Sequence, residues 1–262
     1  MASLKPTYAI DNCRAAYQLN WSLSVFWNQP ALSAESWLPA LQQAAEPDGV
    51  RILEHRNAES NTSLFLISTI PAVAPAMVVR SVKGRLQHLV RRQQPKAFRR
   101  NYSIHSTGSV NLQAMERYVA TQLDRHPMAD PRVQERLAQY QIHDDAVDLS
   151  TVRTSAYGQF VYNLHVVLVH GGRGVDVRDE WLRTTTDTLR RIADKKGHLL
   201  TRASLVADHL HMILGCDVTE APGSVVLSYM NNLAHVHGGK AVFQYGFYVG
   251  TVGHYDLNSV RP

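Results

Sequence analysis

The chain has 262 residues, of which 45% are hydrophobic, so it can form one large domain or two of ordinary size with real cores. Its N-terminal segment does not resemble a signal peptide, and no apolar run is long enough to span a bilayer, so we expect an intracellular protein with no membrane partner. Cys13 and Cys216 lie in no ligand-type spacing, which argues against a disulfide framework and a zinc cluster.

The predicted secondary structure follows the same order twice along the chain. It begins with a strand over residues 18–26, an amphipathic helix and a further strand. A strand over 61–68, a helix after Pro75, a short strand and the start of a helix follow. The same order begins again with a strand over 163–170 and continues through a strand over 209–216.

Matched residues in the two series indicate an internal duplication. The matched pairs are Tyr17 and Tyr162, Trp37 and Trp181, Gly49 and Gly197, Pro75 and Pro222, and Gly108 and Gly253. The offset between partners drifts slowly, as loop insertions and deletions in a duplicated domain would cause. We therefore expect two tandem domains over residues 14–126 and 159–262, joined by a linker over 127–158 with a helix over 131–141.

The size and order of the repeated units predict the fold class. Strands rich in Val, Leu and Ile alternate with helices in each unit, which favours a small α/β sandwich with an antiparallel sheet. Two such ferredoxin-like or RRM-like units in one chain would form a pseudo-dimer.

A basic segment follows the second predicted strand. No acidic residue occurs between Glu59 and Glu116, whereas solvated helix faces usually mix charges of both signs. The segment is typical of a polyanion-binding surface, and binding through it should weaken steeply with salt. Its cationic residues are Arg80, Lys83, Arg85, Arg91, Arg92, Lys96, Arg99 and Arg100.

Two histidines lie one residue apart in the apolar segment over 205–216. In a strand, His209 and His211 leave the same face about 7 Å apart and can converge on one ion or phosphate. A pair of this kind also occurs as a hydrogen-bonded pair at a sheet surface, so the spacing alone leaves both interpretations open.

Four kinds of segment fit one known pattern. They are DHLHMIL over 208–214, VVRSVKGR over 78–85, the glycine turns in YSIHSTGSV and FYVGTVGHY, and RYVATQ over 117–122. Together they resemble the single-tyrosine HUH transposases of small single-strand insertion sequences and their REP-associated relatives. The resemblance covers both halves and implies two HUH-type domains that act on single-stranded or hairpin DNA in the cytoplasm, in association with the nucleoid.

The family's catalytic parts are divided between the halves. In the first half, Asn61 and Ser63 match the histidine positions, whereas Tyr118 and Gln122 match the nucleophile and the auxiliary metal ligand. In the second half the histidine pair is intact, and the matching tyrosine position falls at 263, after the last residue of the sequence. The resemblance therefore implies one composite site, with His209, His211 and Gln122 around a divalent metal, Mg²⁺ or Mn²⁺, and Tyr118 as nucleophile.

The resemblance implies a strand transferase or nickase that works through a 5′-phosphotyrosine intermediate, with a homodimer supplying two sites for two cleavages. The alternative is an inactive hairpin-binding or scaffolding descendant, in which the degenerate halves record loss. A tyrosine at position 263 would be a third interpretation, in which the second half is complete without Tyr118. His165 has no partner at a ligand-type spacing and is interpreted as structural or DNA-facing.

Overall fold

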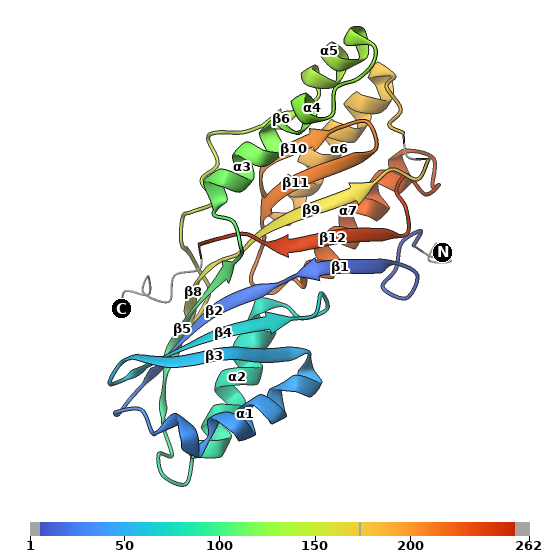
Figure 1. The fold of residues 1–262 in the computed structure, drawn as a ribbon. Coiled ribbons are helices and arrows are strands. Elements are labelled where there is room, and N and C mark those ends of the chain that lie inside the picture. Colours follow the sequence, from blue (N-terminus) through green and yellow to red (C-terminus); the bar gives the residue numbers. More distant parts are fainter. Residues whose placement is uncertain (1–5, 173, 255–262) are drawn as a thin grey trace.

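The structure is a computed structural model and describes residues 6–172 and 174–254. Figure 1 shows two mixed sheets arranged along the long axis of the molecule, with the strands of the second half above and those of the first half below. In the described part of the chain, no helix is both long and apolar enough to cross a membrane.

Each half has the order strand, helix, strand, strand, helix, strand. The elements of the first half are β2 (Asn20–Trp27), α1 (Leu38–Ala45), β3 (Val50–Glu59), β4 (Thr62–Thr69), α2 (Pro75–Val90) and β5 (Phe98–Thr107). Those of the second half are β9 (Asn163–Val169), α6 (Asp179–Lys196), β10 (Leu199–Leu205), β11 (His209–Gly215), α7 (Pro222–Val236) and β12 (Gly246–Thr251). The strand orders β3-β4-β2-β5 and β10-β11-β9-β12 correspond, which confirms the predicted fold of two ferredoxin-like halves.

Short strands exchange between the halves. The remaining elements are β1 (Arg14–Gln18), α3 (Leu112–Ala120), α4 (Gln122–Arg125), α5 (Pro131–Gln139), β6 (Ile142–His143), β7 (Arg153–Thr154), β8 (Gly158–Val161) and two short 3₁₀ turns at 34–36 and 46–48. β1 pairs in parallel with β12 of the second half, and β8 pairs in parallel with β5 of the first half. Each half thus begins with a strand that extends the sheet of the other half, so the halves interlock.

Mirrored hydrogen bonds join the halves where these strands cross. The Ser106 hydroxyl donates to the Val252 carbonyl (2.8 Å), and the Thr251 hydroxyl donates to the Thr107 carbonyl (2.6 Å). Each hydroxyl also accepts from a backbone amide, Asn163 N on Ser106 and Asn20 N on Thr251. The repetition at this junction relates Asn20 to Asn163 and gives the chain an internal pseudo-twofold symmetry.

The core of each half lies between its sheet and its helices. In β2, Trp21, Leu23 and Val25 alternate with more polar residues and are fully buried, as expected for a strand with one face on a core. α2 and α7 both begin at a proline, whose fixed φ suits the first helical turn. The repeated Pro75 and Pro222 therefore mark the same helix start in the two halves.

Candidate active site

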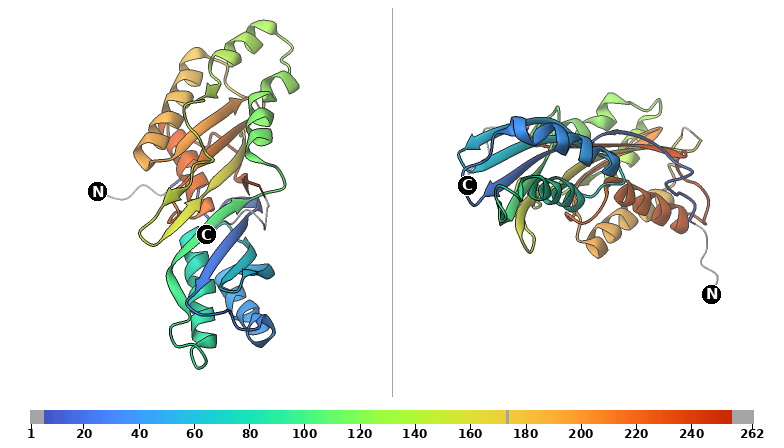
Figure 2. Two further views of the ribbon diagram at one scale, coloured as in Figure 1. Left: turned by 90° about the vertical axis from the view of Figure 1, so that its left-hand side faces the viewer. Right: turned by 90° about the horizontal axis from the view of Figure 1, so that it is seen from below.

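The two histidines of β11 share one face of the upper sheet. The ring centroids of His209 and His211 lie 4.6 Å apart, and β11 pairs with β9 and β10 on either side. Leu210 and Met212 face the opposite side, in the core under α6 and α7. Ile213, which lies on the same face as the histidines, packs with Val119 of α3, so α3 covers the histidine side of β10 and β11. Figure 2 shows this helix, in green, on the face of the sheet opposite α6 and α7.

Tyr118 on α3 lies against these histidines. Its ring meets the ring of His211 edge-on at 5.7 Å between centroids, and that of His165 at 6.1 Å. The side chain remains 36% exposed, so solvent reaches it. The guanidinium carbon of Arg125 lies 5.2 Å from the centre of the tyrosine ring. The tyrosine that follows the first half and the histidine pair of the second half thus meet at one place.

Gln122 lies close to Tyr118, but the two do not share one continuous helix. Their spacing of four residues predicts one shared helix face. The helix instead breaks at Thr121, whose hydroxyl donates to the carbonyls of Arg117 and Tyr118 and competes with the helical pattern. Gln122 opens α4, is 1% exposed, and donates its side-chain amide to the Tyr118 carbonyl (3.0 Å). This bond links the amide side chain to the backbone of the tyrosine.

Two further histidines belong to the same cluster. His165 on β9 stacks on His211 with parallel rings, and its Nε2 lies 2.9 Å from His211 Nδ1. His126, one helical turn after Gln122, lies edge-on to His209 with ring centroids 5.2 Å apart. His165 was missed because its partner is remote in sequence, although the predicted pairing of two antiparallel strands is a signal that brings them together.

Burial keeps the inner imidazoles neutral. It lowers the pKa of His165 to about 4 and that of His211 to about 2, the second also through the neighbouring histidines. His209 Nδ1 lies 2.5 Å from a carboxylate oxygen of Asp208, and this contact orients the ring and leaves its other nitrogen available. Neutral imidazoles are the form that binds metal.

The two histidines of β11 offer ring nitrogens to a ligand. His211 Nε2 is buried and has no hydrogen-bond partner among the described residues, so a ligand at this atom would satisfy it. His209 supplies a second nitrogen, and the Gln122 amide lies on the adjacent helix. In the described ranges, no group of three or more His, Cys, Asp or Glu side chains is arranged to hold a metal, and the Gln122 side chain contacts the Tyr118 carbonyl. A divalent metal held by His209, His211 and Gln122 therefore stays a prediction.

The pairing of the strands corrects the match between the halves. β2 pairs with β4 in the first half, and β9 pairs with β11 in the second, from the related residues Asn20 and Asn163 onward. Six residues later, Phe26 lies opposite Thr62 in the first pair, and Val169 lies opposite His209 in the second. The positions equivalent to His209 and His211 are therefore Thr62 and Leu64. The sequence match to Asn61 and Ser63 is off by one residue, which in a strand inverts the faces: Ser63 accepts a hydrogen bond from the Trp27 indole.

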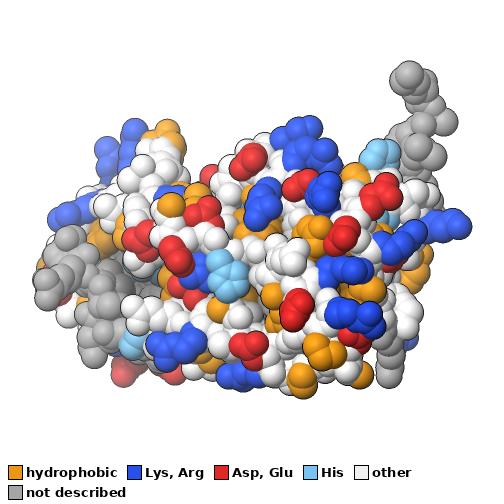
Figure 3. Space-filling view, turned by 90° about the horizontal axis from the view of Figure 1, so that it is seen from above, with side chains coloured by type: hydrophobic (Ala, Val, Ile, Leu, Met, Phe, Trp, Pro, Cys, Tyr) orange, Lys and Arg blue, Asp and Glu red, His pale blue; other side chains and the backbone are white. Residues whose placement is uncertain are grey.

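The predicted DNA-binding cations do not all face the same way. Arg80, Lys83, Arg99 and Arg100 line one groove beside α2. Arg85 lines another and forms a bidentate ion pair with Asp48, 2.8 Å. Arg91, Arg92 and Lys96 are exposed beyond the end of α2. The end of the molecule with α5 and α6, by contrast, mixes acidic and basic side chains (Figure 3).

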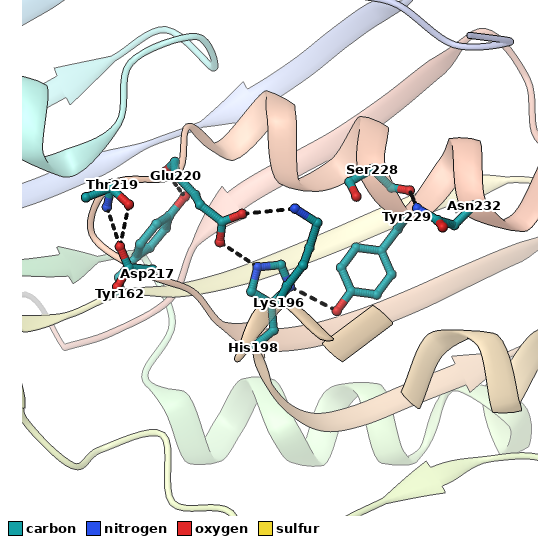
Figure 4. A network of polar contacts seen from close by, with 9 residues as sticks. All are labelled: Tyr162, Lys196, His198, Asp217, Thr219, Glu220, Ser228, Tyr229 and Asn232. Atoms are coloured by element: carbon teal, nitrogen blue, oxygen red, sulfur yellow. Dashed lines mark hydrogen bonds and ion pairs between the residues drawn. The ribbon is translucent and has the colours of Figure 1, made fainter. Parts of the chain in front are cut away.

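A second polar cluster lies on the helix side of the upper sheet (Figure 4). His198 contacts the Glu220 carboxylate (2.6 Å) and the Tyr229 hydroxyl (3.1 Å), and Lys196 pairs with Glu220 at 3.3 Å. The His198 side chain is fully enclosed, so it contacts protein groups rather than a substrate. The cluster fixes the end of α6 to the start of α7 and is structural.

No family model matches the chain, and no curated protein matches it. One similar solved structure is that of a proposed glycine cleavage system transcriptional repressor, with 11% identity over 90% of this chain and 98% of that chain and a TM-score of 0.23. Another is an unknown protein from Galdieria sulphuraria, with 8% identity over 89% and 98% and the same TM-score of 0.23. Likeness of this degree carries no information on function.

Proposed function

We propose that the chain is an HUH-type DNA strand transferase or nickase that cleaves and rejoins single-stranded or hairpin DNA. The observation that supports it best is the contact of Tyr118 with the buried, neutral His211, 5.7 Å between ring centroids, across the two halves of the chain. An exposed phenol, two imidazoles and an amide bonded to the backbone of the phenol's own residue are the groups that such a reaction needs.

In the proposed mechanism, the Tyr118 hydroxyl loses its proton and attacks the phosphorus of a DNA phosphodiester. The bond from phosphorus to the 3′-oxygen breaks, which leaves a 5′-phosphotyrosine and a 3′-hydroxyl that takes up a proton. The Arg125 guanidinium, 5.2 Å from the centre of the ring, would help to hold the tyrosine in place for this attack. Mg²⁺ or Mn²⁺ bound by His209, His211 and Gln122 would polarise the scissile phosphate and offset the developing charge.

The same proposal covers the partners. Attack of a 3′-hydroxyl on the phosphotyrosine reverses the first step and rejoins DNA without an external energy source. Each chain has one composite site, whereas mobilising a DNA element requires two cleavages, so a homodimer on the DNA is part of the proposal. Such a protein would work in the cytoplasm, in association with the nucleoid.

The test is to trap the covalent adduct. The protein is incubated with labelled single-stranded and hairpin oligonucleotides and Mn²⁺, and adducts are resolved by denaturing electrophoresis. We expect an adduct that is absent in Tyr118→Phe but present in Tyr17→Phe, which removes another exposed phenol. If DNA binds but no adduct forms with any substrate, the chain is the hairpin-binding descendant, and the catalytic proposal is wrong.

A further inference from the structure

A groove of about 590 Å³ lies between α2 and β5. Its charged lining residues are all cationic, and three aromatic rings complete its walls. Tyr157, from the segment before β8, is one of them and is 62% exposed. The lining residues are Val79, Arg80, Lys83, Gly84, Gln87, Phe98, Arg99, Arg100, Tyr102 and Tyr157.

The corresponding place in the second half, between α7 and β12, is filled by Tyr8. This ring is 1% exposed, and its hydroxyl donates to the Phe243 carbonyl (2.9 Å) and accepts from the Phe243 amide (2.7 Å). Its backbone amide donates to the Asn231 side chain (2.9 Å), and the Tyr245 ring lies 5.3 Å from its own. A single planar ring thus fits the space between helix and strand.

The three partners of Tyr8 have equivalents in the first groove. Counting from Pro75 and Pro222, which begin α2 and α7, Asn231 corresponds to Gly84. Counting back from the related Thr107 and Val252, Phe243 corresponds to Phe98 and Tyr245 to Arg100. The first groove therefore keeps the phenylalanine, gains a cation, and has open space where the asparagine side chain stands.

We propose that the groove between α2 and β5 binds an unpaired base of single-stranded DNA in the place that the Tyr8 ring takes in the second half. Tyr157 would stack on the base, and Arg80, Arg99 and Arg100 would meet the phosphates on either side. This proposal rests on the proposed function for the identity of the polyanion as DNA.

The walls of the groove are already formed. The Lys83 ammonium donates to the backbone carbonyls of Arg100 (2.8 Å) and Asn101 (3.0 Å), and it joins α2 to β5. Burial lowers the pKa of Lys83 to about 8. On the other side, the Tyr102 hydroxyl lies 2.9 Å from the Ser155 hydroxyl, and its ring covers Gly158, where a Cβ would collide with it. These contacts place Tyr157 at the rim.

The test measures binding in the Tyr118→Phe background, where no cleavage occurs. Fluorescence anisotropy compares a hairpin with a single-stranded flank against the same hairpin fully paired. We expect Tyr157→Ala to weaken binding of the flanked hairpin about tenfold, the effect of losing one stacked base, and to change binding of the paired hairpin less than about twofold. Arg85→Ala is the charge control, since Arg85 faces another groove and is paired with Asp48.

A second pair of variants guards against misfolding. A Cβ at Gly84 meets no atom within 4 Å, and leucine and alanine both favour a helix, so we expect Gly84→Leu to occupy the groove and Gly84→Ala to leave it open. We expect Gly84→Leu to weaken binding of the flanked hairpin as Tyr157→Ala does, and Gly84→Ala to bind normally. Unchanged binding in Tyr157→Ala and Gly84→Leu, or equal loss for both hairpins, overturns the groove proposal. An adduct in the cleavage assay would then still support the catalytic proposal. Conversely, loss of binding in Tyr157→Ala and Gly84→Leu without any adduct in the cleavage assay would support the groove proposal and contradict the catalytic one.

Discussion

The two halves share one fold but differ in what that fold carries. The second half has the histidine pair on β11 and a polar cluster that joins its helices, and its groove is filled by Tyr8. The first half has Thr62 and Leu64 in place of the histidines, and an open basic groove. Tyr118, on the helix that follows the first half, completes the cluster of the second.

Under the proposed function, this difference divides the catalytic groups between the two halves. Because β1 and β8 cross between the sheets, and because the junction repeats the same hydrogen bonds in both directions, each half is held in a fixed relation to the other. A residue needed at one face then has to be present only once in the chain. Variants at equivalent positions of the two halves test whether the halves differ in this way.

The largest difference in the rate of adduct formation is expected between variants at the equivalent positions Thr62 and His209. We expect His209→Ala to slow adduct formation at least about a hundredfold, because it removes an imidazole from the proposed metal site. Thr62→Ala should change the rate less than about threefold. Single-turnover rates with labelled hairpin DNA measure both, and equal losses in the two variants would contradict the division of tasks.

Acid should lower the stability of the second half more than that of the first. Burial lowers the pKa of His165 and His170 to about 4 in the second half, and of His55 to about 4 in the first. Well above pH 6.5 these imidazoles are neutral in the folded and unfolded chain, so the free energy of unfolding does not depend on them. Below it the unfolded chain binds protons that the folded chain does not, and the free energy of unfolding falls until about pH 4.

At pH 5 we expect each of these imidazoles to lower the free energy of unfolding by about 2 kcal/mol. Hydrogen exchange at pH 7 and pH 5, corrected for intrinsic rates and recorded with a chelator present, measures the effect in each sheet. Protection should fall more in β9 and β11 than in β2 and β4. Protection free energies that are the same at both pH values would show that the histidines titrate alike in both states.

The junction should respond equally from either side. Thr251→Val and Ser106→Ala each remove a buried hydroxyl that donates and accepts across the halves. We expect each change to lower the free energy of unfolding by about 1–3 kcal/mol, since buried backbone partners lose their bonds. Urea unfolding measures this. A large loss from only one of the two would mean that the mirrored bonds are not energetically equivalent.

A smaller effect is expected from the exposed cations after α2. Arg91→Ala with Arg92→Ala should weaken DNA binding and reduce the slope of log affinity against log salt by about 1–2. The control is Arg190→Ala with Arg191→Ala on α6, which changes the same charge in the second half. Equal effects of the two double variants would show that the DNA does not prefer the first half.

The sequence predicts the fold well because the hydrophobic patterns and the glycine and proline positions repeat. Gly108 and Gly253 mark equivalent turns, and in the structure the amide of the first donates to the carbonyl of the second (3.0 Å). The crossing of β1 and β8 was not predicted, because residues 18–26 are predicted as one strand with no break after Gln18. Only the pairing partners show that the strand divides at Leu19.

The sequence predicts several residues of the candidate site but not their surroundings, and the catalytic and metal-binding roles of these residues stay predictions. His209, His211, Tyr118 and Gln122 follow from motifs, and the structure places the tyrosine against His211. His165 was not predicted, because contact between two strands depends on register rather than on sequence spacing. The break at Thr121 was also missed, since it depends on a hydroxyl that bonds back to the preceding turn.

The central claim is that one chain supplies both the tyrosine and the histidines of the same site. Mixing Tyr118→Phe with a second variant that carries His209→Ala and His211→Ala tests it most directly. In the mixture no single chain has a complete set, so the account predicts no covalent adduct, whereas the unaltered protein forms one. An adduct in the mixture would show that Tyr118 acts on the histidines of a partner chain, and would contradict a site built within one chain.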